Sequence, residues 1–161
     1  MPVFTPDEFR AALGQFATGV TIVTAFDDQG RRLGLTANSF NSVSLQPPLV
    51  LWSLSKQSTS MPGLLSAPTY AVNVLAADQQ VLAERFARKG IDRFEGVSWR
   101  PGLSGAPLIT GAVASFECKH RSHHDEGDHL IFVGEVTHCA RRVGATPLLF
   151  HGGRFFTGWP R

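Results

Sequence analysis

The sequence predicts a mainly β protein, an antiparallel β-barrel with helices at its periphery. About seven or more segments have the β-branched and apolar composition of strands, whereas only about two or three have helical spacing. The strands follow one another as hairpins across short turns and do not alternate with helices, as strands of a parallel sheet would. No strand leads into a helix through a GxGxxG loop, so a bound dinucleotide would not use the Rossmann arrangement.

The first half of the chain is expected to begin with a helix and continue as strands. Thr5-Pro6-Asp7-Glu8 has the pattern of a capping box with proline at the first helical position. Apolar residues then recur at helical spacing, and Gly19 is expected to end this helix. Pro47 and Pro48 lead into the third strand. The strands expected in this half are 20–26, 33–37 and 49–54, with a turn at 27–30.

The second half is expected to contain two short helices and the remaining strands. One helix is expected at 61–65, and Asp78 is expected to cap the other. Residues 88–105 are rich in Gly, Arg and Ser and read as a long loop. A long hairpin is expected around the turn at 125–127. The strands expected here are 69–75, 112–119, 130–139, 147–150 and 154–157.

Length and composition indicate one compact domain over residues 1–161. A chain of 161 residues can bury a core without disulfides. Only 17% of the residues are charged, which suggests that part of the surface is hidden in an oligomer. The net charge is +2, and the arginine pairs at 31–32 and 141–142 are isolated, so nucleic-acid binding is not expected.

The cysteines and the N-terminal residues indicate a cytoplasmic protein. Cys118 and Cys139 are expected to be free thiols, as is typical of a reducing compartment. Pairing around the long hairpin would put Cys118 opposite the neighbourhood of Phe132, away from Cys139. The start of the chain lacks the pattern of a secretory signal. No apolar run approaches the ~20 residues of a membrane-spanning helix.

Residues 36–44 are too polar for an ordinary core strand. A flavin ring alternates donors and acceptors along its edge, and short neutral side chains can match that edge without imposing charge. A second cluster, at 53–59, combines hydroxyls with Lys56 and suits a phosphate. Turns rich in Ser, Thr and Asn have the same composition, so these residues alone leave both interpretations open. The polar residues of the first segment are Thr36, Asn38, Ser39, Asn41, Ser42 and Ser44.

An ordered set of motifs resembles the flavin reductase-like family. Any one motif is weak, but the set spans roughly residues 8–157 in the order of the family. The motifs are 16–24, 34–40, 42–50, 71–75, 82–87, Gly127-Asp128-His129, 134–136, 147–150 and Phe155. The resemblance implies an FMN-binding split barrel that uses NADH or NADPH to reduce FMN or FAD. It also implies a homodimer and a separate flavin-dependent monooxygenase that receives the reduced flavin.

The resemblance also assigns the cofactor-binding residues. Arg88 and Lys89 would lie at the phosphate end or, if FAD is bound, at the adenylate, although cations at the end of a helix also suit its dipole in solvent. The full set is Thr36, Ala37, Asn38, Ser39, Val43, Ser44, Ser53, Leu54, Ser58, Thr59, Phe86, Ala87, Arg88, Lys89 and Phe155. Two other activities remain open: a split-barrel flavoprotein that holds FMN tightly and acts on another substrate, and a non-catalytic carrier of flavin or haem.

His129 is the expected catalytic residue. In the family pattern this histidine lies on the nicotinamide side of the flavin, where it could orient the nicotinamide or balance protons. The nearby cluster His120, His123 and His124 also suggests a metal. Its spacing is irregular for zinc and neither cysteine lies beside it, so exposed histidines at a hairpin tip are the preferred interpretation and no metal is expected.

Overall fold

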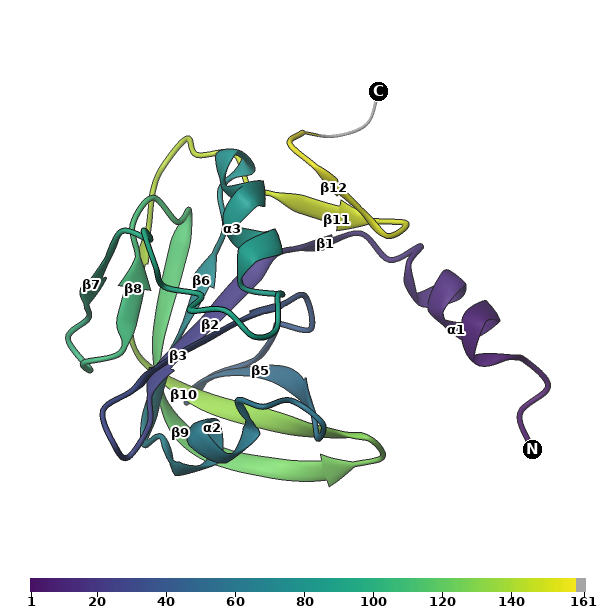
Figure 1. Ribbon diagram of the computed structural model, residues 1–161, viewed down its shortest axis with the longest axis horizontal. Helices are drawn as coiled ribbons and strands as arrows, with labels where there is room; N and C mark the ends of the chain where they lie inside the picture. Colours follow the sequence, from purple (N-terminus) through teal and green to yellow (C-terminus); the bar gives the residue numbers. More distant parts are fainter. Residues whose placement is uncertain (159–161) are drawn as a thin grey trace.

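The computed structural model describes residues 1–158, and its body is a seven-stranded antiparallel sheet (Figure 1). The strand order is β3-β2-β6-β9-β10-β5-β4, so β3 and β4 are the two edges of the ladder. The mainly β prediction is therefore confirmed. The strands of this sheet are β2 (Thr21–Phe26), β3 (Arg32–Ala37), β4 (Asn41–Leu45), β5 (Pro48–Ser55), β6 (Thr69–Val74), β9 (Ala114–Glu126) and β10 (His129–Arg141).

Smaller elements surround this sheet. A three-stranded sheet has the order β1-β11-β12, and β7 pairs with β8 in a short hairpin. These strands are β1 (Thr18–Gly19), β7 (Trp99–Pro101), β8 (Pro107–Ile109), β11 (Leu149–His151) and β12 (Arg154–Phe156). The helices are α1 (Pro6–Leu13), α2 (Met61–Ser66), the 3₁₀ turn η1 (Ala77–Gln79) and α3 (Gln80–Arg85). Figure 1 shows α1 projecting away from the body.

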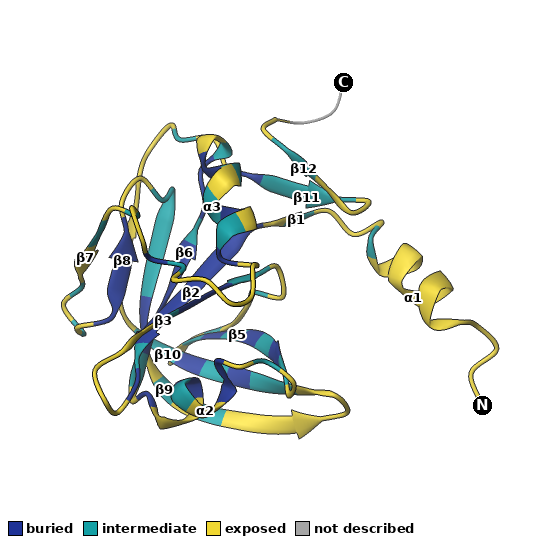
Figure 2. Cartoon of the chain, in the orientation of Figure 1, coloured by how far each residue is buried: buried dark blue, intermediate teal, exposed yellow. Residues whose placement is uncertain are grey.

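Two separate apolar clusters lie on the two faces of β2, because successive side chains of a strand point in opposite directions. The sealed core contains Val23 and is dominated by three rings, Trp52, Tyr70 and Phe132, each with no exposed surface. The site-side core contains Ile22 and has two half-buried aromatic residues at its border. Its members are Val20, Ile22, Leu75, Ala83, Phe86, Phe94, Ile109 and Leu148, bordered by Phe150 and Phe155. In Figure 2 the buried residues concentrate on the central strands such as β2, whereas α1 and most outer loops are exposed.

The first helix begins as expected but ends early. Thr5 and Glu8 form the predicted capping box, in which Thr5 N–H donates to Glu8 Oε2 at 2.6 Å. The helix stops at Leu13 with Gly14 as its cap, so the predicted end at Gly19 is wrong. Its apolar stripe misled the prediction, because no residue of α1 is buried and the ring of Phe9 contacts only partly exposed Phe4 among the aromatic side chains described.

The start of the third helix also differs from the prediction. Asp78 lies inside the 3₁₀ turn and caps no helix. The side chain of Gln79 holds the turn instead, because its Oε1 accepts from the backbone N–H of Ala76 at 2.9 Å and its Nε2 donates to the carbonyl of Thr110 at 2.9 Å. The predicted loop at 88–105 contains strand β7, which is stabilised by pairing with β8 outside that loop.

The long hairpin has a different register from the one predicted. Its turn lies at Gly127-Asp128, and two bulges, one at Arg121 in β9 and one at Thr137 in β10, shift the pairing. Cys118 consequently pairs with Val136 and not with the neighbourhood of Phe132. Both thiols are free, as expected, with Cys118 buried and Cys139 exposed. Burial raises the pKa of the Cys118 thiol to about 12, so it stays protonated at neutral pH.

Candidate functional site

An apolar hollow of 240 Å³ opens where β3, the end of α3 and the β11–β12 hairpin meet. Five residues that the sequence assigned to the cofactor line it together, although they come from three segments far apart in the chain. Its lining residues are Val20, Thr36, Ala37, Asn38, Ala87, Phe150 and Phe155. Phe150 and Phe155 stand opposite each other in the hairpin, with ring centroids 5.1 Å apart. They form an aromatic wall beside the polar end of β3.

Hydrogen bonds join β3 to the end of α3 on the other side of this hollow. Thr36 Oγ1 donates to the carbonyl of Ala83 at 2.6 Å, and Thr36 N–H donates to the carbonyl of Phe86 at 3.3 Å. The ring of Phe86 is itself buried. The side chain of Thr36 is therefore committed to the scaffold, and the exposed polar group at this point is Asn38.

A second hollow, of 400 Å³, adjoins the first and shares Asn38 with it. It is lined by residues 16–19 and 38–41. The sequence reasoning assigned no site role to 16–19, although these residues open the first family motif. It also left Phe150 out of the site. The motif at 147–150, which ends in an aromatic residue across a short turn from Phe155, could have indicated Phe150.

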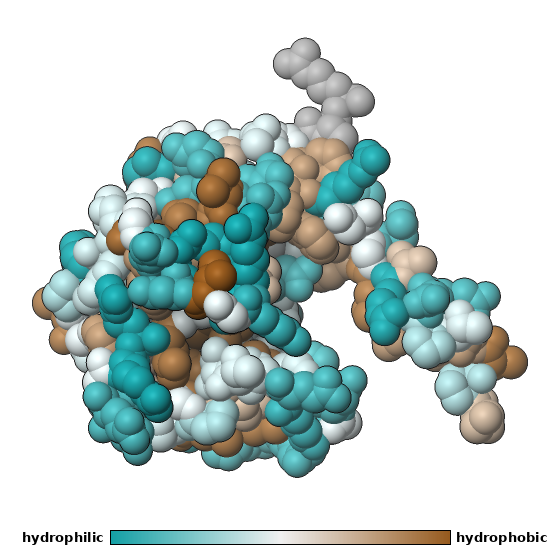
Figure 3. Space-filling view, in the orientation of Figure 1, coloured by the Kyte–Doolittle hydropathy of each residue, from teal (hydrophilic) through white to brown (hydrophobic). Residues whose placement is uncertain are grey.

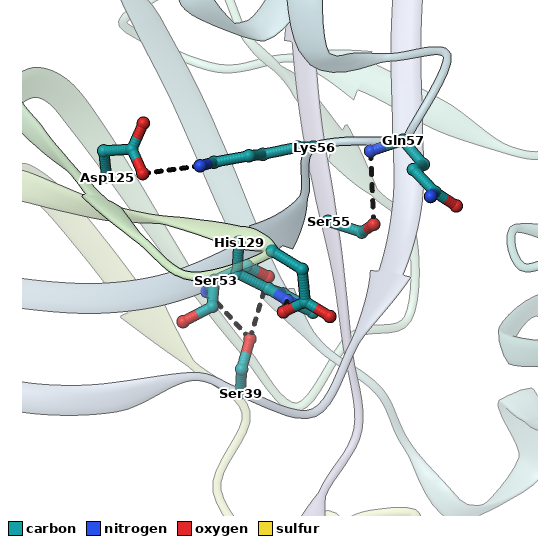
Figure 4. Close-up of polar contacts among 8 residues, drawn as sticks. Ser39, Ser53, Ser55, Lys56, Gln57, Asp125 and His129 are labelled. Atoms are coloured by element: carbon teal, nitrogen blue, oxygen red, sulfur yellow. Dashed lines mark hydrogen bonds and ion pairs between the residues drawn. The ribbon is translucent and has the colours of Figure 1, made fainter. Parts of the chain in front are cut away.

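Ser39, which lines the second hollow, joins the segment after β3 to strand β5 (Figure 4). Ser39 Oγ accepts from Ser53 N–H at 2.9 Å and donates to the Ser53 carbonyl at 3.2 Å. This pair of bonds fixes the chain after β3 against β5. Ser55 lies two residues further along β5, on the same face as Ser53 and directly opposite His129 in β10.

His129 is oriented by the residue before it. Its Nδ1 lies 2.6 Å from Asp128 Oδ1, and this hydrogen bond holds the pKa of the Asp128 carboxyl below its ordinary value. The carbonyl of Asp128 in turn accepts from Lys56 N–H at 2.9 Å, which ties the turn to the end of β5. With Nδ1 bonded to the carboxylate, Nε2 is the ring nitrogen left available for a further hydrogen bond.

A third hollow, of 290 Å³, lies along the earlier part of β3. Its lining is mainly polar and consists of Arg32, Leu33, Gly34, Thr59, Ser60 and residues 90–94. It therefore brings Thr59, which the sequence assigned to a phosphate, opposite the loop that follows Arg88 and Lys89. The hydroxyl residues Thr59 and Ser60 and the cation Arg32 line it, and phosphate oxygens accept hydrogen bonds from such groups.

The chain is similar to known proteins over most of its length. The family model of the flavin reductase like domain matches residues 13–158. The chain belongs to this family. An FMN reductase (NADH) of Agrobacterium fabrum is 51% identical over 147 residues, covering 91% of this chain and 83% of that protein. A reductase subunit of a flavin-dependent monooxygenase of Rhodococcus jostii is 41% identical over 150 residues, covering 93% and 76%.

A solved structure of the flavin reductase family is similar over almost the whole chain. It is the NADH:FAD oxidoreductase of Streptomyces globisporus in complex with NAD and FAD fragments, with a TM-score of 0.91 and 43% identity. The similarity covers 99% of this chain and 98% of that one.

Several residues that the flavin reductase resemblance assigned lie outside these hollows. The side chains of Leu54 and Phe86 point into the two cores and are 6% and 0% exposed, so a ligand could reach only their backbone. Ser58 Oγ accepts from Ser60 N–H at 3.2 Å and closes a turn. The other residues outside are Val43 and Ser44 on the edge strand β4, Ser53 on β5, His129 at the start of β10, and Arg88 and Lys89 on an exposed loop.

The remaining polar residues of the sequence prediction have structural partners. Lys56, expected beside a phosphate, forms an ion pair with Asp125 at 2.5 Å. His120 Nε2 lies 3.0 Å from His123 Nδ1, and the His120 ring packs against Phe132. Within residues 1–158 no group of three or more His, Cys, Asp or Glu side chains is placed to hold a metal ion.

Proposed function

We propose that this protein is an NADH-dependent flavin reductase that supplies reduced FMN or FAD to a separate monooxygenase. The observation that carries the proposal is the meeting of Thr36–Asn38, Ala87 and Phe155 around one hollow in a chain of this family. NADH is favoured over NADPH because two similar proteins are named for NADH. Both FMN and FAD stay in the proposal, because one of those relatives is named for each.

The chemistry of the hollows fits a flavin. The first two share Asn38 and have volumes of 240 and 400 Å³, so together they reach the size of small-molecule sites, roughly 300–1,000 Å³. The rings of Phe150 and Phe155, tilted by 59° to each other, offer apolar surface to the ring system, and Asn38 offers both a donor and an acceptor. The polar third hollow suits the phosphate end, since Thr59 and residues 90–94 meet there.

When both cofactors are bound, hydride passes from nicotinamide C4 to flavin N5, and this chemistry belongs to the cofactors. The protein contributes proximity and orientation. Asp128 holds the His129 ring through Nδ1, which leaves Nε2 to hydrogen-bond the nicotinamide when it is bound. The Ser39–Ser53 bonds fix the segment after β3, which lines the second hollow, against β5. Phe150 and Phe155 exclude water from one side of the ring system.

The open site is consistent with flavin as a substrate that leaves after reduction. Asn38 and Ala87 are exposed and neutral, and Arg88 and Lys89 stand on the rim. Neutral contacts provide no strong electrostatic grip on the reduced, anionic flavin ring. Reduced flavin can therefore dissociate, and a separate flavin-dependent monooxygenase would be the protein that consumes it.

We also propose that the sheet is of the FMN-binding split-barrel type. The edge strands β3 and β4 are consecutive in the chain, and the Ser39–Ser53 bonds bring the end of β3 onto β5. The sealed core lies between strands from both halves of the sheet, with Leu35 of β3 and Val50 of β5 in one cluster. A strongly curved sheet wrapped around that core would account for both contacts.

The projecting helix α1 supports a homodimer. Its large apolar side chains are exposed, with Phe9 at 51% and Leu13 at 58%, and Phe16 just beyond the helix reaches 78%. Figure 3 shows apolar surface on this segment. An eight-residue helix is marginal on its own, so we propose that a second copy covers it. Light scattering on the wild type and on Leu13→Glu, which would be monomeric, tests this assignment.

A cytoplasmic location remains part of the proposal. Across the described residues 1–158, no helix is both long and apolar enough to cross a bilayer.

The activity is tested by mixing purified protein with NADH and either FMN or FAD and following absorbance at 340 nm. Flavin-dependent loss of NADH, with multiple turnovers for each protein molecule, is the expected result. The proposed function is wrong if no combination of flavin with NADH or NADPH gives flavin-dependent oxidation. The same assay with NADPH tests the nucleotide preference.

A further inference from the structure

The loop after α3 is fixed to β3 by one arginine. Arg93 Nε donates to the carbonyl of Arg88 at 2.7 Å, and Arg93 Nη1 donates to the carbonyl of Gly34 at 2.8 Å. These two carbonyls belong to segments more than fifty residues apart in the chain. A guanidinium can bond both at once because its donors are arranged as a rigid planar fork. Arg93 therefore acts as a bridge between the loop and the β-sheet.

A second arginine holds the base of the same loop. Arg85, in the last turn of α3, donates from Nε to the carbonyl of Arg93 at 2.9 Å and from Nη2 to the carbonyl of Asp92 at 2.7 Å. Asp92 Oδ1 accepts from Phe94 N–H at 3.1 Å. The loop is thus fixed to the helix at one point and to β3 at another, although most of its residues are exposed.

The hydrogen bonds of Arg93 fix the position of the backbone that carries two cationic side chains, Arg88 and Lys89. The backbone of Arg88 is held on both sides, because its N–H donates to the carbonyl of Arg85 at 3.1 Å and its carbonyl accepts from Arg93. The side chains of Arg88 and Lys89 are exposed, and neither forms an ion pair within the described residues. The loop that carries them borders the polar third hollow, opposite Thr59.

We propose that Arg93 is a positioning residue that holds Arg88 and Lys89 where they meet the phosphate of the bound flavin. The inference rests on the proposed function and adds a residue that the sequence reasoning did not assign. Arg93 lines the third hollow, but its Nε and Nη1 are bonded to backbone carbonyls and it acts through the loop, so its loss should weaken phosphate binding and leave the ring site intact. Binding of the isoalloxazine depends on the first two hollows, which Arg93 does not line.

The comparison of FMN with riboflavin, which has the same ring but no phosphate, isolates this effect. For Arg93→Ala we expect the KM for FMN to rise roughly tenfold, the scale of one lost charged hydrogen bond. The kcat with FMN and the KM for riboflavin should each stay within about twofold of wild type. Arg93→Lys keeps the charge but loses the fork, so its KM for FMN should lie between the two.

Two further variants complete the test. The double variant Arg88→Ala/Lys89→Ala should raise the KM for FMN at least as much as Arg93→Ala, with the same indifference to riboflavin. Arg100→Ala is the matched control, because this exposed arginine lies on β7, outside the three hollows, and it should change neither KM.

The outcomes separate the inference from the proposed function. Equal increases in both KM values for Arg93→Ala and Arg93→Lys, or no increase in either, would overturn the positioning role. If the wild type oxidises no NADH, the proposed function fails by itself. Equilibrium binding of FMN and riboflavin, followed by flavin fluorescence, then still tests Arg93. A selective loss of FMN binding in the variant would support the inference, and identical affinities would refute it.

Discussion

The sealed core and the site-side core lie on opposite faces of β2 and are built from the same kinds of apolar residue, yet they end differently. The sealed core has Trp52 stacked on Phe132, with ring centroids 4.6 Å apart and both side chains fully buried. The site-side core ends at Phe150 and Phe155, which are only half-buried and line the hollow. One cluster has completed its packing within the chain, whereas the other leaves an aromatic surface for a ligand.

The comparison teaches that stability and binding are divided between the two faces of one sheet. A side chain surrounded on all sides contributes its full burial to folding. A ring at the border contributes less to folding and keeps surface free for binding. Substitutions in the two clusters should therefore separate the free energy of unfolding from the KM for flavin.

The largest effect is expected in the sealed core. Trp52→Ala removes the ring that contacts both Tyr70 and Phe132 and should lower the free energy of unfolding by about 3–5 kcal/mol. Chemical denaturation measures the loss. Trp52→Phe keeps an aromatic ring and should cost less, and Val81→Ala on the exposed face of α3 should stay within about 0.5 kcal/mol of wild type. A small effect of Trp52→Ala would mean that this core is not closed.

The next effect is expected inside the site-side core. A Cβ at Gly34 would lie 2.5 Å from a ring carbon of Phe86, so Gly34→Ala should cost about 1–3 kcal/mol through overpacking. The matched control is Gly19→Ala, because nothing lies within 4 Å of the added atom there. That control should be neutral or slightly stabilising in the same denaturation experiment. Equal stabilities of the two variants would contradict the packing described around Phe86.

At the border of the site-side core, the change should appear in binding. Phe155→Ala removes half of the aromatic wall and should raise the KM for flavin roughly tenfold, or about 1.4 kcal/mol. Phe155→Ala should lower the free energy of unfolding by less than Gly34→Ala does. Steady-state kinetics and denaturation on the same preparation test both statements. If Phe155→Ala loses stability but keeps its KM for flavin, Phe155 has a structural role and no binding role.

The smallest effect is expected where the sealed core meets solvent. Burial, followed by the nearby His123, lowers the pKa of His120 below its ordinary value near 6.5. The unfolded chain then binds the proton more readily than the folded one, so stability should fall as the pH drops from about 7 through 6.5. Since the ring is partly exposed, the loss should stay below about 1 kcal/mol.

His120→Gln removes this titration and should flatten the dependence of unfolding free energy on pH between about 7 and 5. His151→Gln, at a half-buried position on β11, is the matched histidine control and should keep the slope. An unchanged slope in His120→Gln would assign the pH dependence to other groups.

Much of the fold follows from local patterns. The capping box at Thr5 and Glu8, the turn at 27–30 and the hairpin around 152–153 were predicted because each depends on residues close in the chain. The bulges in β9 and β10 and the 3₁₀ turn at Gln79 were not predicted, because they depend on contacts with distant segments. One inserted residue changes the register of every pair beyond it.

The candidate site divides in the same way. By itself, the sequence determined the class of the fold, the family, and the polar character of Thr36–Ser39 and Gly127–His129, because those properties reside in residue types and their order. Only the tertiary structure decided that Phe150 joins Phe155 at the site, that Leu54 and Phe86 turn inward, and that Arg93 bridges two distant carbonyls. Each of these depends on contacts between segments far apart in the chain, which no local pattern specifies.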